Sequence, residues 1–329
     1  MLNKIKRILK SKVLVLGFFV FILVFGYGIS LAFEKSKMNL SAENDFLIEP
    51  GKTEIFANPG ETITKSISIT SRIDKTTKFK LTTEDMVGTN DANTPVKLLG
   101  DEAGPYTVKD LIKPEISEFS LDLGEKITIP ITVTVPINAE PRGYYGALIV
   151  SNEPEILGDT ANPINTEGQA RLISRIGSLF FLRINGEGKE GGSLDSFKIS
   201  GPSKAFYENR PSGFEIGFKN TGNVHLVPHG KVIIKNILGK DVGEINVDAY
   251  FSLPDSIRYR EVLWSPGTGL GRYTANLSLY PGFGNENQEA SISFWIIPWK
   301  ILIITFVGLI ILISLIYYVL TRFELKKKK

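Results

Sequence analysis

Residues 124–135 read GEKITIPITVTV. After the turn-forming Gly124, an isoleucine or valine stands at every second position from 127 to 135, and threonine or proline stands between them. A period of two places successive side chains on opposite faces, so this segment predicts a β-strand with one buried face. Pro130 has no N–H to donate to a neighbouring strand. We therefore expect the strand to lie at a sheet edge, or to carry a bulge at Pro130.

A similar phrase occurs earlier, where residues 59–70 read PGETITKSISIT. Again a glycine turn leads into alternating isoleucine and hydroxyl residues. Tandem duplication is one explanation. The simpler one, which we favour, is that two strands of one sandwich follow the same sequence of turn and strand.

The same style of sequence fills the chain from Phe46 to Ile296: short alternating runs separated by Gly, Pro and Asn. Such runs are typical of antiparallel sheets packed face to face. The glycine-rich stretch 186–192 divides the runs into two groups. We predict a mostly β protein with two immunoglobulin-like β-sandwich domains in tandem, at residues 45–185 and 193–297, and a long polar loop at 88–105.

The C-terminal end predicts a membrane helix at residues 298–321. From Ile301 to Leu320 the chain is almost continuously apolar, and about 20 such residues match a bilayer core of roughly 30 Å. Trp299 at one end and Tyr317 at the other occupy the positions of interfacial aromatic residues. The basic tail, residues 322–329, is expected to stay in the cytoplasm because lysine is costly in the membrane.

The N-terminal residues 1–32 predict a signal peptide or an uncleaved signal anchor. A basic segment precedes a long apolar run, and Ser30-Leu31-Ala32 offers a cleavage site after Ala32. Both alternatives place the segment between the two ends outside the cell. We therefore expect a single-pass protein of the plasma membrane with its ectodomain outside.

Composition limits the possible functions. The formal charge is +3, but the basic residues are concentrated at the two ends, so the predicted ectodomain is acidic. A nucleic-acid partner would require a basic surface and is not expected. The chain contains no cysteine, which excludes disulfides, thiolate catalysis and cysteine-based metal sites.

Three patterns could indicate chemistry, and each has a better structural explanation. Gly186–Gly191 matches GxGxxG, but a strand-like segment follows it instead of the helix that would bind a pyrophosphate. His225 and His229 have Pro228 between them, and on a strand they would stand about 13 Å apart, too far to share one zinc ion. We interpret both as surface or turn histidines. No pair of carboxylates stands out, so we predict no enzymatic activity, cofactor or metal.

Several of these pieces together resemble the WxL-interacting protein family of Gram-positive cell surfaces. The resemblance covers the whole architecture and rests on short motifs, with Ser71 and the phrase Asn220–His225 departing from it. These motifs are Pro59-Gly60-Glu61, Pro136 with Gly143–Leu148, Leu179–Leu182, Leu253–Ser256 and Gly271-Arg272-Tyr273. The resemblance implies a first domain that contacts peptidoglycan and a second domain that docks a surface protein. None of the matched motifs is a binding motif, so no ligand-binding residue is assigned.

The sequence thus predicts a membrane-anchored extracytoplasmic binding or scaffolding protein. The edge expected at Pro130 suggests capture of a partner strand by β-augmentation. Two alternatives stay open: an accessory subunit of a secretion or surface-fibre system, and a carbohydrate-active enzyme with an unrecognised carboxylate pair.

Overall fold

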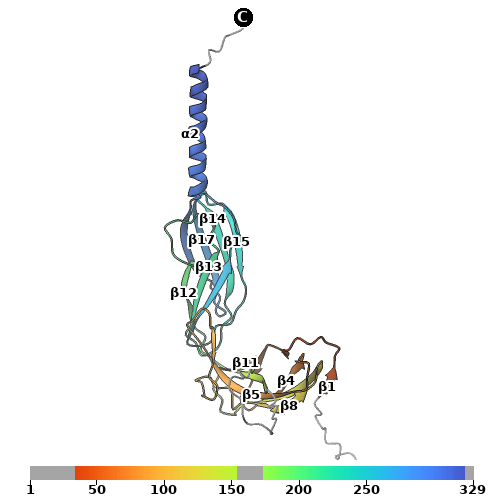
Figure 1. Ribbon diagram of the computed structural model, residues 1–329. Coiled ribbons are helices and arrows are strands. Elements are labelled where there is room, and N and C mark those ends of the chain that lie inside the picture. The colour runs from red at the N-terminus through yellow and green to blue at the C-terminus, as the bar shows by residue number, and fades with distance from the viewer. Residues whose placement is uncertain (1–33, 154–172, 323–329) are drawn as a thin grey trace, which may run out of the picture.

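The computed structural model describes residues 34–153 and 173–322. The predicted signal segment 1–32 and residues 323–329 of the predicted tail lie outside the described residues. Figure 1 shows two β-sandwich domains followed by one long helix, with the first domain turned across the long axis of the second. The predicted fold class, mostly β with tandem immunoglobulin-like domains and a C-terminal apolar helix, is confirmed.

The first domain packs two sheets face to face. One has the order β1-β9-β4-β2 with β7 also paired to β9, and the other has the order β3-β11-β10-β5-β6 with β8 also paired to β5. All pairs are antiparallel except β3 with β11. The strands are β1 (Glu34–Lys37), β2 (Phe46–Glu49), β3 (Lys52–Ala57), β4 (Thr62–Ser71), β5 (Thr77–Gly88), β6 (Val96–Leu98), β7 (Ile112–Pro114), β8 (Glu118–Leu121), β9 (Glu125–Thr134), β10 (Gly143–Glu153) and β11 (Arg175–Ile184).

The alternating strands form the core of this domain. The isoleucines and valines of β9 that point inward are almost completely buried, and Ile67 and Ile69 of β4 meet them on the same face. Phe79 packs at the centre of the opposite sheet, with its ring 5.1 Å from that of Phe46. β4 and β9 carry the two similar phrases of the sequence and pair with each other, so the phrases mark neighbouring strands of one sheet.

The expectation that Pro130 marks an edge or a bulge is wrong. β9 pairs with β4 on one side in an unbroken register, and β1 and β7 share its other side. The Pro130 carbonyl accepts a hydrogen bond from Glu115 N–H, so the missing N–H of Pro130 points to this shared side. The pairing of β1 ends at Thr128 and that of β7 begins at Ile131. Proline is tolerated because it faces the gap between two short strands.

The predicted long loop at 88–105 is also interrupted. Its centre forms the short strand β6, which folds back to pair with the end of β5. The sequence pattern did not indicate this strand because the segment is polar and the strand has only three residues.

The second domain is a smaller sandwich with the sheet orders β12-β13-β16 and β15-β14-β17-β18. Trp264, Tyr273 and Phe294 pack against one another in its core. The Gln288 side chain closes one open side, because it bonds to the backbone of Gly192 and Leu194. The strands are β12 (Gly192–Ile199), β13 (Gly213–Asn220), β14 (His229–Asn236), β15 (Asp241–Val247), β16 (Ser256–Leu263), β17 (Gly271–Tyr280) and β18 (Gln288–Ile296).

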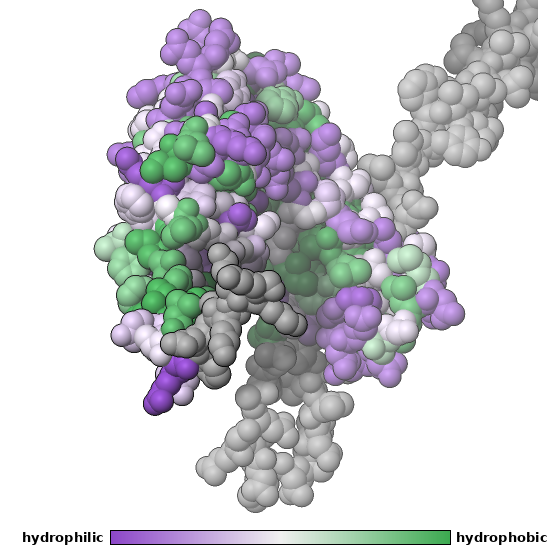
Figure 2. Space-filling model, turned by 90° about the horizontal axis from the view of Figure 1, so that it is seen from above, coloured by the Kyte–Doolittle hydropathy of each residue, from purple (hydrophilic) through white to green (hydrophobic). Residues whose placement is uncertain are grey.

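The helix α2 (Trp299–Arg322) follows β18 after only Ile297 and Pro298. The connection is held to the domain, since Ile297 N–H donates to the Tyr207 carbonyl at 2.7 Å and Lys300 pairs with Glu208 at 3.0 Å. Every residue of α2 is exposed, and the helix is long and apolar enough to cross a membrane. Figure 2 views the molecule from above and shows green hydrophobic patches bordered by purple hydrophilic surface.

Candidate binding surface and the domain junction

The segment Asn220–His225 joins the two domains. Asn223 accepts a hydrogen bond from Gly143 N–H of β10 through its carbonyl and another from Lys189 N–H of the linker through its side chain, at 2.9 and 2.8 Å. Its own N–H donates to the Lys189 carbonyl. One asparagine therefore holds the first domain, the linker and the second domain together.

Asn220 and Gly222 allow this segment to lie close to the linker. Asn220 is completely buried, and its amide donates to the carbonyls of Val224 and Ser252 while its oxygen accepts from Gly222 N–H. A Cβ on Gly222 would lie 2.3 Å from the Lys189 carbonyl oxygen, so only glycine fits there. The unusual phrase Asn220–His225 was visible in the sequence. The sequence did not show that this phrase bonds to Lys189 of the linker.

His225 lies at the centre of the junction and is 7% exposed, so its interpretation as a surface or turn histidine is wrong. Its backbone N–H donates to the Tyr145 hydroxyl at 2.5 Å. Its ring packs edge-on against Tyr145 and Phe181 of the first domain. His229 is exposed on β14, as expected, and the two side chains are not brought together.

Burial lowers the pKa of His225 to about 4. Glu54 Oε1 lies 3.8 Å from its Nε2 atom and raises the pKa, but desolvation outweighs this attraction. The imidazole is therefore neutral at pH 7 despite the adjacent carboxylate. The pKa of Glu54 is itself lowered, chiefly by its hydrogen bond from Lys52.

A second set of contacts closes the other side of the junction. The Tyr106 hydroxyl donates to Asp255 at 2.8 Å, and the Asn90 side chain accepts from Ile257 N–H at 2.8 Å. Burial and the Asp255 carboxylate raise the pKa of Tyr106 to about 12. Together with the small apolar cluster of Met86, Tyr145, Phe181 and Leu253, these bonds fix how the domains meet.

The GxGxxG pattern lies in the linker, as predicted from the strand that follows it. Gly186 has a φ of 136°, and the stretch leads directly into β12. The described structure has no helix N-terminus at this position that could receive a phosphate.

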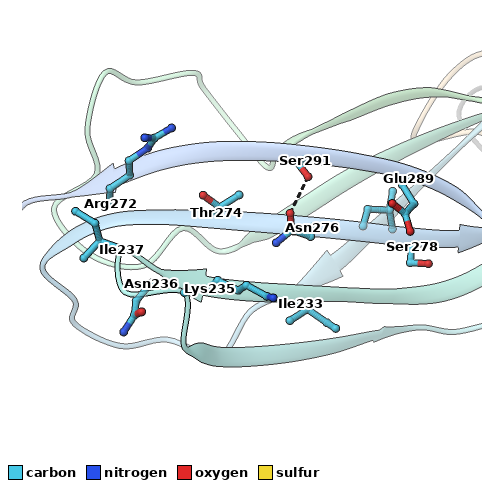
Figure 3. A pocket seen from close by; sticks show the side chains of 12 residues that line it. Ile233, Lys235, Asn236, Ile237, Arg272, Thr274, Asn276, Ser278, Glu289 and Ser291 are labelled. Atoms are coloured by element: carbon cyan, nitrogen blue, oxygen red, sulfur yellow. Dashed lines mark hydrogen bonds between the residues drawn. The ribbon is translucent and has the colours of Figure 1, made fainter.

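A surface depression lies on the outer face of the second domain, where the sequence analysis assigned no site. It has a volume of about 570 Å³ and crosses β14, β17 and β18; we call it the trough. Its side chains are mainly hydroxyls, amides and single charges, with Ile237 at the hairpin end and Ile233 farther along β14 (Figure 3). Its lining is Ile233, Lys235, Asn236, Ile237, Gly239, Arg272, Thr274, Asn276, Leu277, Ser278, Glu289 and Ser291.

Strand alternation explains the trough. Along β17 every second residue is buried in the core, so Arg272, Thr274, Asn276 and Ser278 all point outward. Asn276 accepts a hydrogen bond from the Ser291 hydroxyl at 2.7 Å, drawn as the dashed line in Figure 3. These side chains are held in place by their neighbours but keep free donors and acceptors toward solvent.

The trough continues toward the junction. A second depression of about 510 Å³ shares Ser278 with it and reaches His229 and Tyr280, whose tilted rings have centroids 5.1 Å apart. Among the described residues, no carboxylate lies within 4 Å of the Arg272 guanidinium, and no cation within 4 Å of the Glu289 carboxylate. The combined surface is long, polar and of mixed charge, which suits an extended polar chain better than a small apolar ligand.

No family model and no curated protein matches this sequence. Solved structures similar to it include a chaperone–tip adhesin complex of CFA/I fimbriae biogenesis, at 11% identity and a TM-score of 0.39, covering 76% of this chain and 98% of that one. The class 5 fimbriae chaperone CfaA is 13% identical with a TM-score of 0.37, covering 77% and 100%. The CsuC–CsuE chaperone–adhesion subunit complex of Acinetobacter baumannii is 13% identical with a TM-score of 0.35, covering 75% and 98%. What the chain has in common with these proteins is fold alone.

Proposed function

We propose that this protein is a membrane-anchored, non-enzymatic binding protein that holds a segment of a surface or secreted protein in the trough of its second domain. The trough itself is the observation that carries the proposal. It is open and elongated, its side chains are positioned by strand pairing, and its outward groups can bond to both donors and acceptors.

The anchor gives the trough a defined place. α2 has the length of a membrane span, and only two residues separate it from β18, which forms one wall of the trough. The exposed side chains of Trp295 and Trp299 suit the membrane–water interface. We propose that the ectodomain is outside the cell and the basic tail in the cytoplasm. A partner in the trough would then be held next to the bilayer.

An accessory subunit of a secretion or surface-fibre system would perform one form of this function. The identity of the partner would establish whether this protein is such a subunit. Peptidoglycan contact by the first domain, implied by the resemblance to WxL-interacting proteins, is a further proposal.

Site-specific photo-cross-linking in cells tests the proposal. A photoreactive residue is placed at Ser291 in the trough and, as a matched control, at Lys219, an exposed position on the central strand of the opposite sheet. We expect a discrete cross-link to a surface or secreted protein from position 291 and none from position 219. Mass spectrometry of the cross-linked band identifies the partner.

A bulky substitution gives an independent test. Asn276→Trp fills the centre of the trough, whereas Lys219→Trp adds the same bulk to the other face. The cross-link from position 291 should be lost in the first variant and kept in the second. Equal cross-linking in both variants, or cross-links to wall glycan only, would contradict the proposal.

A further inference from the structure

Two arginines on β16 face the core side of the second domain. Arg258 pairs in register with Phe218, and Arg260 pairs with Ile216; both partners on β13 are completely buried. Residues directly opposite each other on paired strands point to the same face. Arg258 and Arg260 therefore belong to the inner face, where charged residues are rare unless they are paired.

The position of β16 explains where their guanidinium groups go. β16 is an edge strand of its sheet, and β15 is the edge strand of the sheet packed against it. Both arginines are partly exposed while their Nε atoms are buried, so their side chains cover the core at this open side. The segment from Asp248 to Asp255 connects β15 to β16 and carries Tyr250 into the same region.

None of these polar groups has a partner among the described residues. No carboxylate lies within 4 Å of either guanidinium, and neither donates a hydrogen bond. The Nε atoms of Arg258 and Arg260 are buried without a partner, and so is the hydroxyl of Tyr250, a residue that is only 6% exposed. The remaining contact is that of the Arg258 guanidinium with the Phe251 ring, at 5.8 Å.

The directions of the pKa shifts indicate that the three groups are influenced by one another's charge. Desolvation lowers the pKa of Arg258, and the charge of Arg260 lowers it further. Burial raises the pKa of Tyr250, while both arginines act to lower it. Two like charges and a buried hydroxyl without a partner are unfavourable together, and an anion accepting hydrogen bonds from all three would relieve this.

We propose that Arg258, Arg260 and Tyr250 form an anion site that receives a carboxylate side chain of the protein partner. The identity of the partner class rests on the proposed function. A lipid phosphate is the less suitable ligand, because Arg258 lies roughly 16 Å along β16 from Leu263, near the membrane-facing end. The arginine fork matches the planar geometry of a carboxylate.

The test uses the full chain in nanodiscs and measures the melting temperature in sodium acetate, sodium phosphate and sodium chloride at matched ionic strength. We expect acetate to raise the melting temperature by several degrees relative to chloride. The double variant R258Q/R260Q should lose this difference, and K240Q, which removes an exposed charge in the β14–β15 turn, should retain it.

Two conservative variants keep the proposal testable if the double variant folds poorly. Y250F removes only the unpartnered hydroxyl, so its melting temperature in chloride should rise while the gain from acetate shrinks. R258K/R260K keeps both charges without the planar fork and should show a reduced gain.

Three results would overturn the assignment. If acetate and chloride act alike on the wild type, there is no carboxylate site. A larger gain from phosphate than from acetate would assign the site to phosphate. If R258Q/R260Q keeps the gain but aggregates, the arginines instead protect a strand edge from pairing. These measurements require no partner. A failure of the carboxylate-site proposal can therefore be told apart from a failure of the proposed function, which would appear as loss of the trough cross-link.

Discussion

At the scale of single residues, His225 makes the stability of the folded protein depend on pH. Its pKa of about 4 in the folded protein lies below the 6.5 expected when it is unfolded. As the pH falls below 6.5, the unfolded state therefore binds the proton first, and the folded state loses stability until about pH 4. The difference corresponds to about 3 kcal/mol. The lowered pKa of Glu54 acts in the same direction, since its contribution is also lost on acidification.

The expected outcome is a fall in the melting temperature of the wild type between pH 6.5 and 4, measured by circular dichroism. His225→Gln should flatten this dependence, because the titrating ring is removed. His229→Gln, at the exposed histidine, should leave it unchanged. An equal slope in all three proteins would exclude His225 as the cause.

Gly222 provides a second prediction at this scale. Gly222→Ala places a Cβ against the Lys189 carbonyl and should destabilise the junction by about 1–3 kcal/mol. Because Lys189 would then be released from Asn223, trypsin should cleave the linker faster. Gly51→Ala, where an added Cβ meets nothing within 4 Å, is the control. Unchanged cleavage would show that the linker is not held by this contact.

At the scale of elements, two substitutions in β9 test the contributions of side-chain burial and of backbone hydrogen bonding separately. Ile129 is completely buried, so Ile129→Ala should cost about 2–5 kcal/mol in the free energy of unfolding. Pro130→Ala restores an N–H that faces the gap between β1 and β7. This substitution should change the free energy of unfolding by less than about 1 kcal/mol. Urea unfolding of the two variants gives both values. A large effect of Pro130→Ala would indicate that the proline shapes the strand.

The same strand shows what the sequence could predict. Alternation is a local property, so Ile127 to Val135 indicated a strand and its buried face correctly. Whether a strand has neighbours on both sides depends on distant segments, and Pro130 was misplaced for that reason. His225 was misplaced similarly, because its burial comes from Tyr145 and Phe181 of the other domain. The trough needed three strands in register before its outward polar residues became a surface.

At the scale of the whole molecule, the three tryptophans allow a test of the proposed membrane insertion of α2. Trp264 is buried in the second core, whereas Trp295 and Trp299 are exposed near the start of α2. In nanodiscs containing brominated lipid, we expect part of the tryptophan fluorescence to be quenched. Trp295→Phe with Trp299→Phe should abolish the quenching, and Trp264→Phe should not. Quenching that survives the double variant would contradict the proposed depth of the helix.

The short connection between β18 and α2 also determines how the protein responds to a pull. Tension on the first domain passes through the Asn223 contacts and enters the second domain at β12, and it leaves at the opposite end through β18 into the helix. Force is thus applied along the strands, and the hydrogen bonds between them are loaded together in shear instead of opening one at a time. Because only Ile297 and Pro298 separate β18 from α2, the load reaches the helix without a slack segment to absorb it.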